Sequence, residues 1–341
     1  MNTLASIQVI SEINPASNAD SLELAIIQGW QSVVKKGDFK VGDKIVFVSI
    51  DSLMPPASYN KFLWNKNRPD EMIRVKTIRL RGNVSQGIVF KMDDLTPDAI
   101  QNPEKYEVGM DVTELLGIQK YEREIHGSMN ANAVGTFATD LISITDEDNL
   151  QSNLRVLEEL AERDVVLSLK IDGMSFTALY DGKFRIFSRR LELNPEDDSV
   201  YSRMAKKYDL QNKLSCMPYK CAIQAEICGP KIQDNPLSLK EEEMFIFNIK
   251  LLEREMLGSY YGHQSMIDFC DVRSLPMVPT IKIIEKFDLT LPQLQELANN
   301  AKYDNGAEAE GIVIRPLIYQ YSRVLRKMLS VKVLNQNYKH N

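Results

Sequence analysis

The feature that most constrains the fold is an apolar run that ends in a lysine. Residues 167–173 read Leu-Ser-Leu-Lys-Ile-Asp-Gly, which puts the lysine at position 170. A leucine-rich run of this kind predicts a buried strand, and the Asp-Gly pair predicts a turn out of it. Such a strand would deliver Lys170 to the edge of a pocket with its aliphatic stem buried. The alternative is an ordinary surface lysine before a turn.

A lysine at such a place is a candidate nucleophile. Because a protonated amine cannot attack, we expect the site to lower the pKa of Lys170 by burial or by neighbouring cations. A short motif by itself is weak support, so the surrounding segments decide the interpretation.

The composition is that of an ordinary globular protein, with 26% charged and 44% hydrophobic residues among 341. This length predicts two domains. No apolar stretch is long enough to span a bilayer, and the N-terminus lacks the layout of a signal peptide. The chain has four cysteines, no Cys-x-x-Cys pair and only three histidines. This composition argues against a zinc site and against a disulfide scaffold. We expect a cytoplasmic monomer that contacts no membrane.

Positive charge is concentrated in two stretches of an acidic chain. The formal net charge is −6, yet residues 61–91 hold eight basic and two acidic residues, and residues 315–341 hold six basic and no acidic ones. These stretches predict local contacts with a polyanion, the alternative being two solvated faces.

Residues 1–118 are predicted to form an all-β domain, because short apolar runs alternate with turn residues. In Ile73–Arg81 the apolar alternation changes phase near Thr77, which predicts a bulge or a sharp bend. Small closed barrels need such bends, so we predict a barrel of the oligonucleotide/oligosaccharide-binding (OB) type. Its first part resembles the OB domains of tRNA-binding proteins. That resemblance is carried by Asn18–Glu23, Gly29, Trp30, Gly42 and Asp43.

The rest of the chain predicts an α+β domain. Residues 119–144 have weak periodicity and are predicted to be a linker to a domain over residues 145–341. Thr145 is a candidate N-cap with Asp148 three positions on, so a helix is predicted to begin there. Its apolar stripe would consist of Leu150, Leu154, Leu157 and Leu160.

A predicted hairpin follows the lysine. Two strand-like runs flank the Asp-Gly pair at 181–182, the signal of a two-residue turn. That turn would put Tyr180 opposite Lys183 and bring Arg189 beside the loop that carries Lys170. Arg189 would then bind an anionic ligand and help to lower the pKa of the lysine. The alternative is an exposed arginine at the end of a hairpin.

Three later strand-like runs carry polar or aromatic groups. Glu226 and Glu310 lie next to Ile and Val, where a glutamate is disfavoured unless it is paired or binds a metal. Phe245 and Phe247 have the spacing of two rings on one strand face, which is equally typical of plain core aromatics. A further lysine, Lys332, lies inside an apolar strand.

In this order, the segments resemble the motifs of the covalent nucleotidyltransferases, which comprise DNA ligases, RNA ligases and mRNA-capping enzymes. Lys170–Gly173 looks like motif I, Ser188–Arg190 like motif Ia, Phe245–Ile249 like motif III/IIIa, Glu310–Arg315 like motif IV, and Val331–Val333 like motif V. The resemblance covers residues 145–337. It implies a domain of antiparallel sheets flanked by helices.

The domain order resembles the nick-sealing RNA ligases of the Deinococcus and Naegleria type, over the full chain. In DNA ligases and capping enzymes an OB domain follows motif V, and we expect none here because nine residues follow Lys332. Two positions depart from the family pattern. Ser330 replaces the first lysine of motif V, where Lys327 is a candidate substitute, and Arg315 replaces the frequent last lysine of motif IV.

The resemblance implies an ATP-dependent RNA ligase that joins 3′-hydroxyl and 5′-phosphate ends in RNA or an RNA-containing duplex. Lys170 would carry AMP, while Lys332, Lys327 and Arg189 would contact the nucleotide and Phe247 would stack on adenine. A Mg²⁺ or Mn²⁺ ion suits a carboxylate site. By motif match, its ligands would be Asp172, Glu226 and Glu310, with the ribose as the alternative partner of Glu226.

Other interpretations stay open at this point. The chain could be another covalent nucleotidyltransferase, such as a DNA ligase or a guanylyltransferase. It could also be a nucleic-acid-binding protein with an inactive transferase domain, an alternative supported only by the missing lysine at position 330.

Overall fold

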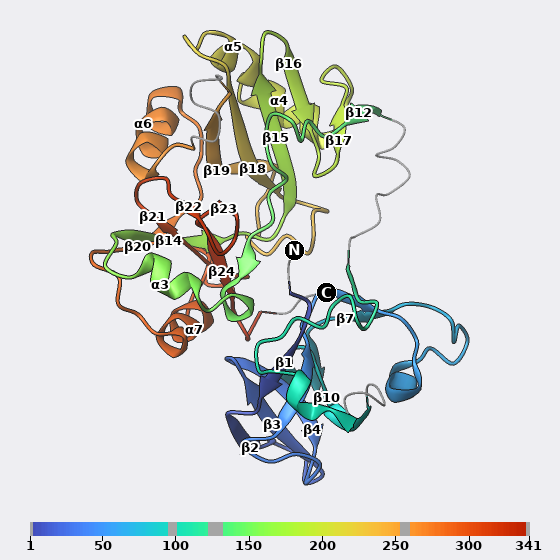
Figure 1. The fold of residues 1–341 in the computed structure, drawn as a ribbon. Helices are drawn as coiled ribbons and strands as arrows, with labels where there is room; N and C mark the ends of the chain where they lie inside the picture. The colour runs from blue at the N-terminus through green and yellow to red at the C-terminus, as the bar shows by residue number, and fades with distance from the viewer. Residues whose placement is uncertain (1–2, 95–100, 122–131, 253–259, 339–341) are drawn as a thin grey trace. The chain divides into compact units, whose positions relative to one another are not determined.

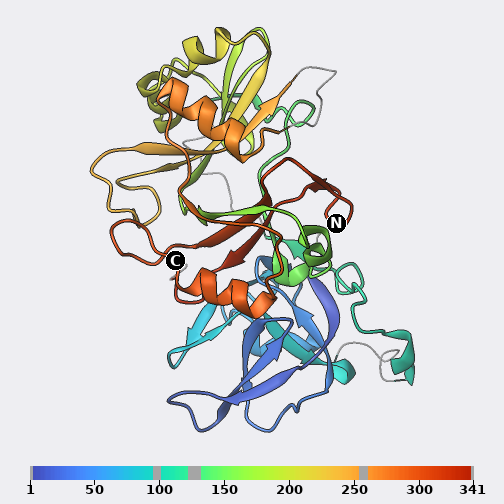
Figure 2. The ribbon, with the colours of Figure 1, turned by 90° about the vertical axis from the view of Figure 1, so that its left-hand side faces the viewer.

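The computed structural model describes residues 3–94, 101–121, 132–252 and 260–338. The chain divides into two compact units, one up to residue 124 and the other over residues 125–339. Both units consist mainly of strands (Figures 1 and 2). The helices α3 to α7 lie in the second unit, and the first unit holds the short 3-10 helices η1 (Ser58–Leu63), η2 (Met92–Asp94) and η3 (Pro103–Lys105).

The first unit consists of short antiparallel strands around one apolar core. Ile7, Val46, Val48 and Phe90 are among its buried side chains. One sheet holds β1 (Ala5–Val9), β5 (Lys44–Val48) and β10 (Ile88–Lys91); another holds β2 (Glu12–Pro15), β3 (Leu22–Ile27) and β4 (Trp30–Lys35); a third holds β6 (Ser52–Met54), β7 (Ile73–Val75) and β11 (Gln119–Lys120); and β8 (Ile78–Leu80) pairs with β9 (Asn83–Ser85).

The phase change near Thr77 is a break between two strands. β7 ends at Val75 and pairs with β6, whereas β8 begins at Ile78 and pairs with β9 in a different sheet. The predicted bend is therefore confirmed. It turns the chain from one sheet to the next, as a small barrel requires.

The second unit contains a six-stranded antiparallel sheet with one face covered by helices. The sheet order is β12 (Ala133–Thr136), β17 (Leu191–Leu193), β16 (Phe184–Phe187), β15 (Met174–Tyr180), β18 (Cys221–Cys228) and β19 (Glu243–Leu251). Apolar side chains of α4 (Val200–Lys207), α5 (Leu210–Ser215) and α6 (His263–Arg273) pack on it, visible in the upper part of Figure 1. Ile223, Ala225 and Ile227 alternate toward these helices, which leaves Gln224 and Glu226 on the other face.

The second sheet of this unit carries the lysine strand. Its order is β13 (Asp148–Asn149), β24 (Val331–Leu334), β21 (Gly311–Pro316), β14 (Val165–Lys170) and β20 (Thr280–Ile284), with only the β13–β24 pair parallel. Val165, Leu167 and Leu169 pack into a core with α3 (Val156–Leu160) and α7 (Leu291–Asn299). Short elements complete the unit: η4 (Leu150–Ser152), β22 (Tyr321–Ser322) and β23 (Lys327–Met328).

The helix predicted to begin at Thr145 is wrong. Residues 148–149 form β13, and the helical segments begin only at Leu150 and Val156. Asp148 is buried and pairs with Lys327, at 3.0 Å between carboxylate and amine, so the strand pairing with β24 outweighs the local capping signal. Three members of the predicted apolar stripe do lie in the core, since Leu150 and Leu160 are fully buried and Leu157 packs against this core.

The predicted hairpin exists, but its register is wrong by one residue. Tyr180 lies opposite Phe184, not Lys183, so the connection has three residues. The Asp181 side chain accepts a hydrogen bond from the Lys183 N–H, which closes this longer loop. The ladder ends at Thr177 opposite Phe187, before the arginines.

Part of the predicted linker is folded. Ala133–Thr136 form β12 at the edge of the six-stranded sheet. The predicted boundaries at residues 118 and 145 stay predictions. Within the described ranges, no helix has the length and apolarity needed to cross a bilayer.

Candidate active site

Lys170 is the last residue of β14, and the strand positions it as the sequence predicted. Its neighbours Leu167 and Leu169 point into the core, so Ser168 and Lys170 share the opposite face. The turn after it packs very closely on β18. A Cβ atom on Gly173 would lie 2.3 Å from the Ile227 carbonyl oxygen, so glycine is required there.

Strand pairing brings the first carboxylate to the lysine. Lys170 lies opposite Gly311, and Glu310 directly precedes that residue. The Lys170 amine donates to Glu310 Oε2 at 2.7 Å, and the two side chains are only 22% and 13% exposed. A Cβ atom on Gly311 would lie 2.2 Å from the Val333 carbonyl oxygen, so β21 can approach β24 only with a glycine at this place.

Two further carboxylates, Asp172 and Glu226, act on the same amine. Although burial favours the neutral amine, the charges of Glu310, Glu226 and Asp172 raise the pKa of Lys170. Burial, together with Glu310 and Asp172, raises the pKa of Glu226 to about 8, with Lys170 opposing this shift. One ammonium therefore faces three carboxyl groups.

The expectation of a lowered lysine pKa is therefore wrong for the protein without ligands. Arg189 opposes the rise in the pKa of Glu226, while at Lys170 the neighbouring carboxylates outweigh the effect of burial. The physical reason is the 2.7 Å contact of the Lys170 amine with Glu310, to which the charges of Glu226 and Asp172 add. A bound cation that competes for these carboxylates would favour the neutral amine.

The surplus of negative charge fits a divalent cation. Among the residues that the structure describes, no three Asp, Glu, His or Cys side chains are grouped so as to hold a metal ion by themselves. Mg²⁺ is usually held by one or two carboxylates together with waters and substrate phosphates, so a full protein cage is not required. The acidic, oxygen-only donor set at Lys170 fits Mg²⁺ or Mn²⁺.

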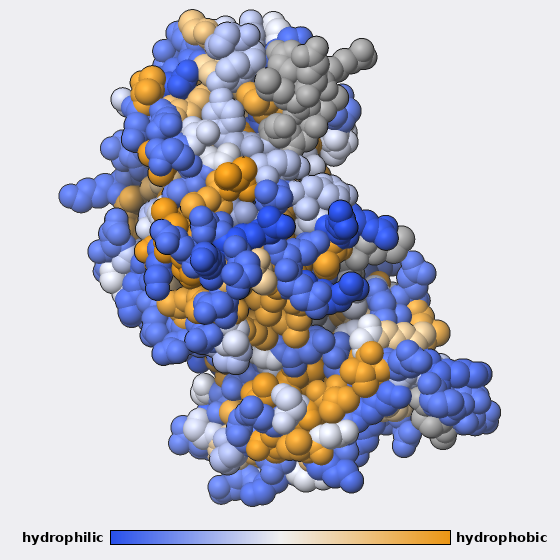
Figure 3. Space-filling model, turned by 60° about the vertical axis from the view of Figure 1, so that its left-hand side comes forward, coloured by the Kyte–Doolittle hydropathy of each residue, from blue (hydrophilic) through white to orange (hydrophobic). Residues whose placement is uncertain are grey.

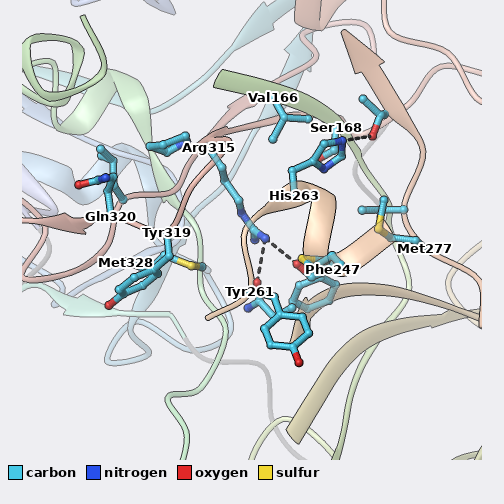
Figure 4. Close-up of a pocket in the computed structure, with 16 residues that line it drawn as sticks. Val166, Ser168, Phe247, Tyr261, His263, Met277, Arg315, Tyr319, Gln320 and Met328 are labelled. Atoms are coloured by element: carbon cyan, nitrogen blue, oxygen red, sulfur yellow. Dashed lines mark hydrogen bonds between the residues drawn. The ribbon is translucent and has the colours of Figure 1, made fainter. Parts of the chain in front are cut away.

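Phe247 lines a pocket that is also lined by the face of β14 that carries Lys170. The pairing of β18 with β19 shifts between Gln224 opposite Asn248 and Ala225 opposite Ile246, so Phe247 is the extra residue of a bulge. Bulges re-aim side chains next to functional sites. The pocket walls include Phe247, Val166 and Ser168, the last two being on the face of β14 that carries the lysine (Figure 4).

Arg315 lines this pocket, and its side chain forms hydrogen bonds with four residues. Its guanidinium donates to the Phe247 carbonyl at 2.6 Å and to Asn248 Oδ1 at 2.8 Å, the contacts drawn in Figure 4. It also forms an ion pair with Glu147, and its Nε donates to Ser330 Oγ at 2.7 Å. The two departures from the family pattern, Arg315 and Ser330, thus contact each other.

The remaining predicted site residues are spread around this face. Lys332 lies in β24 opposite Val313, which in turn lies opposite Ser168. This row of three residues is two positions along β14 from Lys170. Lys327 donates to the Asp146 carbonyl at 2.6 Å and pairs with Asp148. Arg189 is half exposed, with its guanidinium 3.5 Å from the Asp146 carboxylate.

Sequence reasoning missed several neighbours of the site. Glu147 and Asn248 hold Arg315, and Tyr303 and Tyr338 contact the loop of Lys170. The sequence contained a signal for Glu147, because this residue lies within residues 145–337, the part that resembles the family. The tyrosines had none, because neither lies in an apolar run or near a motif.

The comparisons with known proteins agree with this arrangement. Residues 4–92 match the model of an OB-fold domain, and residues 163–331 match the model of the RNA ligase family. No curated protein matches the chain. The predicted fold, an OB-type domain followed by a nucleotidyltransferase-like domain of antiparallel sheets, is confirmed.

Solved structures of an RNA ligase from Naegleria gruberi are similar over almost the whole chain. The structure with PPi has a TM-score of 0.79 and 28% identity, and the match covers 98% of this chain and 97% of that one. A lysine-to-methionine mutant with AMP and Mn gives 0.80 and 27%, with the same coverage. A lysine-to-alanine mutant with ATP and Mn gives 0.79 and 27%, covering 97% of each chain.

Proposed function

Since this chain belongs to the RNA ligases, with an OB-fold domain ahead of its ligase domain, we propose that it uses ATP to seal breaks between 3′-hydroxyl and 5′-phosphate ends, nicks in duplexes above all. The observation that carries the proposal is the Lys170 amine, half-buried and 2.7 Å from Glu310 in a site with two more carboxyl groups. The similarity to a ligase solved with ATP, AMP and Mn supports it.

The first step makes an adenylate on the enzyme. The neutral Lys170 amine attacks the α-phosphorus of ATP, a P–N bond forms, and the bond to pyrophosphate breaks. The amine loses its second proton as the P–N bond forms. Phosphoryl transfer depends mainly on alignment and charge neutralisation, and a half-buried amine on a rigid strand end supplies the alignment.

The next two steps transfer AMP and close the break. An oxygen of the 5′-phosphate attacks the adenylate phosphorus, the P–N bond breaks, and the lysine amine takes up a proton. The 3′-hydroxyl then attacks the 5′-phosphorus, releasing AMP and leaving a phosphodiester bond. We assign charge neutralisation of the α-phosphate to Lys332, with Lys327 as a candidate second cation, and contact with the ribose or phosphate to Arg189.

We assign the metal to the carboxylates of Asp172, Glu226 and Glu310, with ribose contact as the alternative for Glu226. A bound Mg²⁺ or Mn²⁺ would neutralise phosphate charge and compete with the lysine for carboxylate oxygens. Phe247 would stack on the adenine, since the bulge turns its ring into the pocket beside Ser168.

We assign the grip on the nucleic-acid strands to the first unit. Its residues 61–91 are rich in lysine and arginine, which bind phosphates without regard to sequence. The Arg74 guanidinium lies 3.6 Å from the ring centre of Tyr121. Figure 3 shows apolar side chains gathered on this unit, in the lower part of the view, within a hydrophilic surface.

We further propose that the protein acts as a monomer in the cytoplasm.

The decisive test is incubation with α-labelled ATP and Mg²⁺ or Mn²⁺, followed by denaturation. We expect acid-labile label on the wild-type protein and on Lys183→Ala, an exposed lysine in the neighbouring hairpin, and none on Lys170→Ala. Label from GTP instead of ATP would indicate a guanylyltransferase. The absence of label with ATP, GTP or NAD would refute the ligase proposal in favour of a binding protein.

A sealing assay then tests the substrate. Nicked duplexes with RNA or DNA on either side of the break are incubated with the labelled enzyme. We expect sealing when the strands at the break are RNA. Sealing of DNA nicks alone would contradict the proposed substrate while leaving the adenylate intact.

A further inference from the structure

Two tyrosines outside every family motif contact the Lys170 site. Tyr303 lies in the loop between α7 and β21, and Tyr338 follows β24. Both side chains are buried, at 4% and 9% exposure. Neither tyrosine has a chemical role in the adenylate-forming, AMP-transfer or sealing step.

The Tyr303 hydroxyl bonds the backbone of three site residues. It donates to the Lys170 carbonyl at 3.2 Å, and it accepts the N–H groups of Asp172 and Glu310, at 3.3 Å each. A phenol has one donor and accepts two hydrogen bonds, so these three contacts use its full capacity. Burial raises the pKa of this phenol, which keeps its proton available for donation.

These bonds lie where the strand ladder stops. The pairing of β14 with β21 ends at Lys170 opposite Gly311, so no ladder bond fixes the turn that carries Asp172. The Tyr303 hydroxyl supplies hydrogen bonds to this turn where the strand pairing has ended. Its own loop is closed by hydrogen bonds with Ala307 and Gly306, at 2.9 and 2.8 Å, and by a 2.7 Å ion pair between Lys302 and Glu308.

Tyr338 acts on the side chain of the same turn. Its hydroxyl donates to Asp172 Oδ2 at 2.8 Å. Its backbone N–H bonds the Asn335 carbonyl at 3.2 Å, and the Asn335 N–H bonds the Glu310 carbonyl at 2.9 Å. One short segment after β24 therefore restrains the two residues that carry carboxylates on either side of the lysine.

We propose that Tyr303 and Tyr338 are positioning residues: Tyr303 fixes the backbone of Lys170, Asp172 and Glu310 so that amine and carboxylates meet, and Tyr338 fixes the rotamer of the Asp172 carboxylate. The proposal rests on the proposed function for the identity of the ligands, ATP and a divalent metal. Hydrogen bonds behind metal-binding side chains typically change metal affinity or activity by about 10- to 100-fold.

The test compares Tyr303→Phe and Tyr338→Phe with Tyr208→Phe. Tyr208 is the matched control, because its phenol also donates to a carboxylate, that of Glu243, away from the Lys170 loop. Three quantities are measured on each full-length variant: the melting temperature, Mn²⁺ binding without nucleotide by electron paramagnetic resonance, and the rate of adenylate formation with saturating ATP and Mn²⁺.

We expect Tyr338→Phe to weaken Mn²⁺ binding about 10-fold or more, and Tyr303→Phe to slow adenylate formation by a similar factor. Both melting temperatures should stay close to that of Tyr208→Phe. The proposal is overturned if both variants match Tyr208→Phe in binding and rate, or if both readouts fall only in proportion to the loss of folded protein.

Failure of the proposed function is distinguishable from failure of this inference. A wild-type protein that binds Mn²⁺ without forming an adenylate would refute the function, and the Mn²⁺ titration of Tyr338→Phe would still decide the role of that hydroxyl. Should Tyr303→Phe not fold, Tyr338→Phe carries the test, because its hydroxyl bonds a side chain and leaves the backbone contacts of the turn intact.

Discussion

The paired strands β14 and β21 carry a buried ion pair at each end, and the two pairs differ in how well they are neutralised. At one end Lys170 pairs with Glu310 while two more carboxyl groups act on the amine. At the other end Arg315 pairs with Glu147 and directs its remaining donors to a hydroxyl, a carbonyl and an amide oxygen.

The charge states of the carboxylates reflect this difference. Although burial opposes ionisation, Arg315 lowers the pKa of Glu147, whereas burial and two neighbouring carboxylates raise the pKa of Glu226 to about 8. The Arg315 cluster is complete without a ligand, so it stabilises the fold. The Lys170 cluster has surplus negative charge, so it fits an additional cation.

The largest expected effect is on the complete cluster. Arg315→Met leaves Glu147 buried without its partner, which should lower the free energy of unfolding by about 3–5 kcal/mol. Urea unfolding followed by circular dichroism measures this. Arg323→Met, at an exposed position, is the control and should stay within about 0.5 kcal/mol of wild type. A loss below about 1 kcal/mol for Arg315→Met would refute the structural role of that cluster.

The incomplete cluster should respond in rate more than in stability. Glu310→Gln removes a carboxylate that pairs with the lysine and that we assign to the metal, so adenylate formation should slow about 100-fold, equal to about 2.7 kcal/mol. Its loss of unfolding free energy should be smaller than that of Arg315→Met, because Glu226 and Asp172 remain beside the amine. Glu285→Gln, an exposed carboxylate, is the control. Equal rates for the two variants would contradict the assignment.

The pH dependence of stability tests the surplus charge directly. Folding raises the pKa of Glu226 from its ordinary 4.5 to about 8, so between these values the folded protein holds a proton that the unfolded chain has lost. Stability from this group therefore falls as pH rises from about 4.5 to 8.

Glu226→Gln removes that dependence. Measured with EDTA, the variant should become progressively more stable relative to wild type as the pH rises from 5 to 8.5. Bound Mn²⁺ should reduce the difference, because the cation stabilises the ionised carboxylate of the wild type. Parallel stability curves for the two proteins would show that the carboxylates at Lys170 are not under mutual repulsion.

The smallest expected effect is at the position where the family usually has lysine. Ser330→Ala removes the acceptor of the Arg315 Nε bond, which should cost about 1 kcal/mol of unfolding free energy and leave adenylate formation unchanged. Ser215→Ala, on an exposed helix position, serves as control. A slower adenylate formation in Ser330→Ala would instead place this serine in the catalytic site.

Much of the site was predictable because its motifs are local. The strand that ends at Lys170, the glycine turn after it and the strands with Glu226 and Glu310 are all visible as apolar runs of the right length. The errors came from signals of equal local strength that tertiary contacts outweighed. Thr145 was a good cap candidate, but the neighbouring Asp148 pairs with Lys327, 179 positions away in the chain.

The sequence by itself determined which segments are strands, which residues are candidates for the chemistry, and which family their motifs resemble, because these depend on residue type and spacing within short stretches. Only the tertiary structure decided the charge balance around Lys170, the closed network of Arg315 and Ser330, and the bonds of Tyr303 to the lysine turn. The physical reason is that pKa values and hydrogen bonds depend on distances of a few ångströms between atoms, and strand pairing sets those distances between residues far apart in the chain.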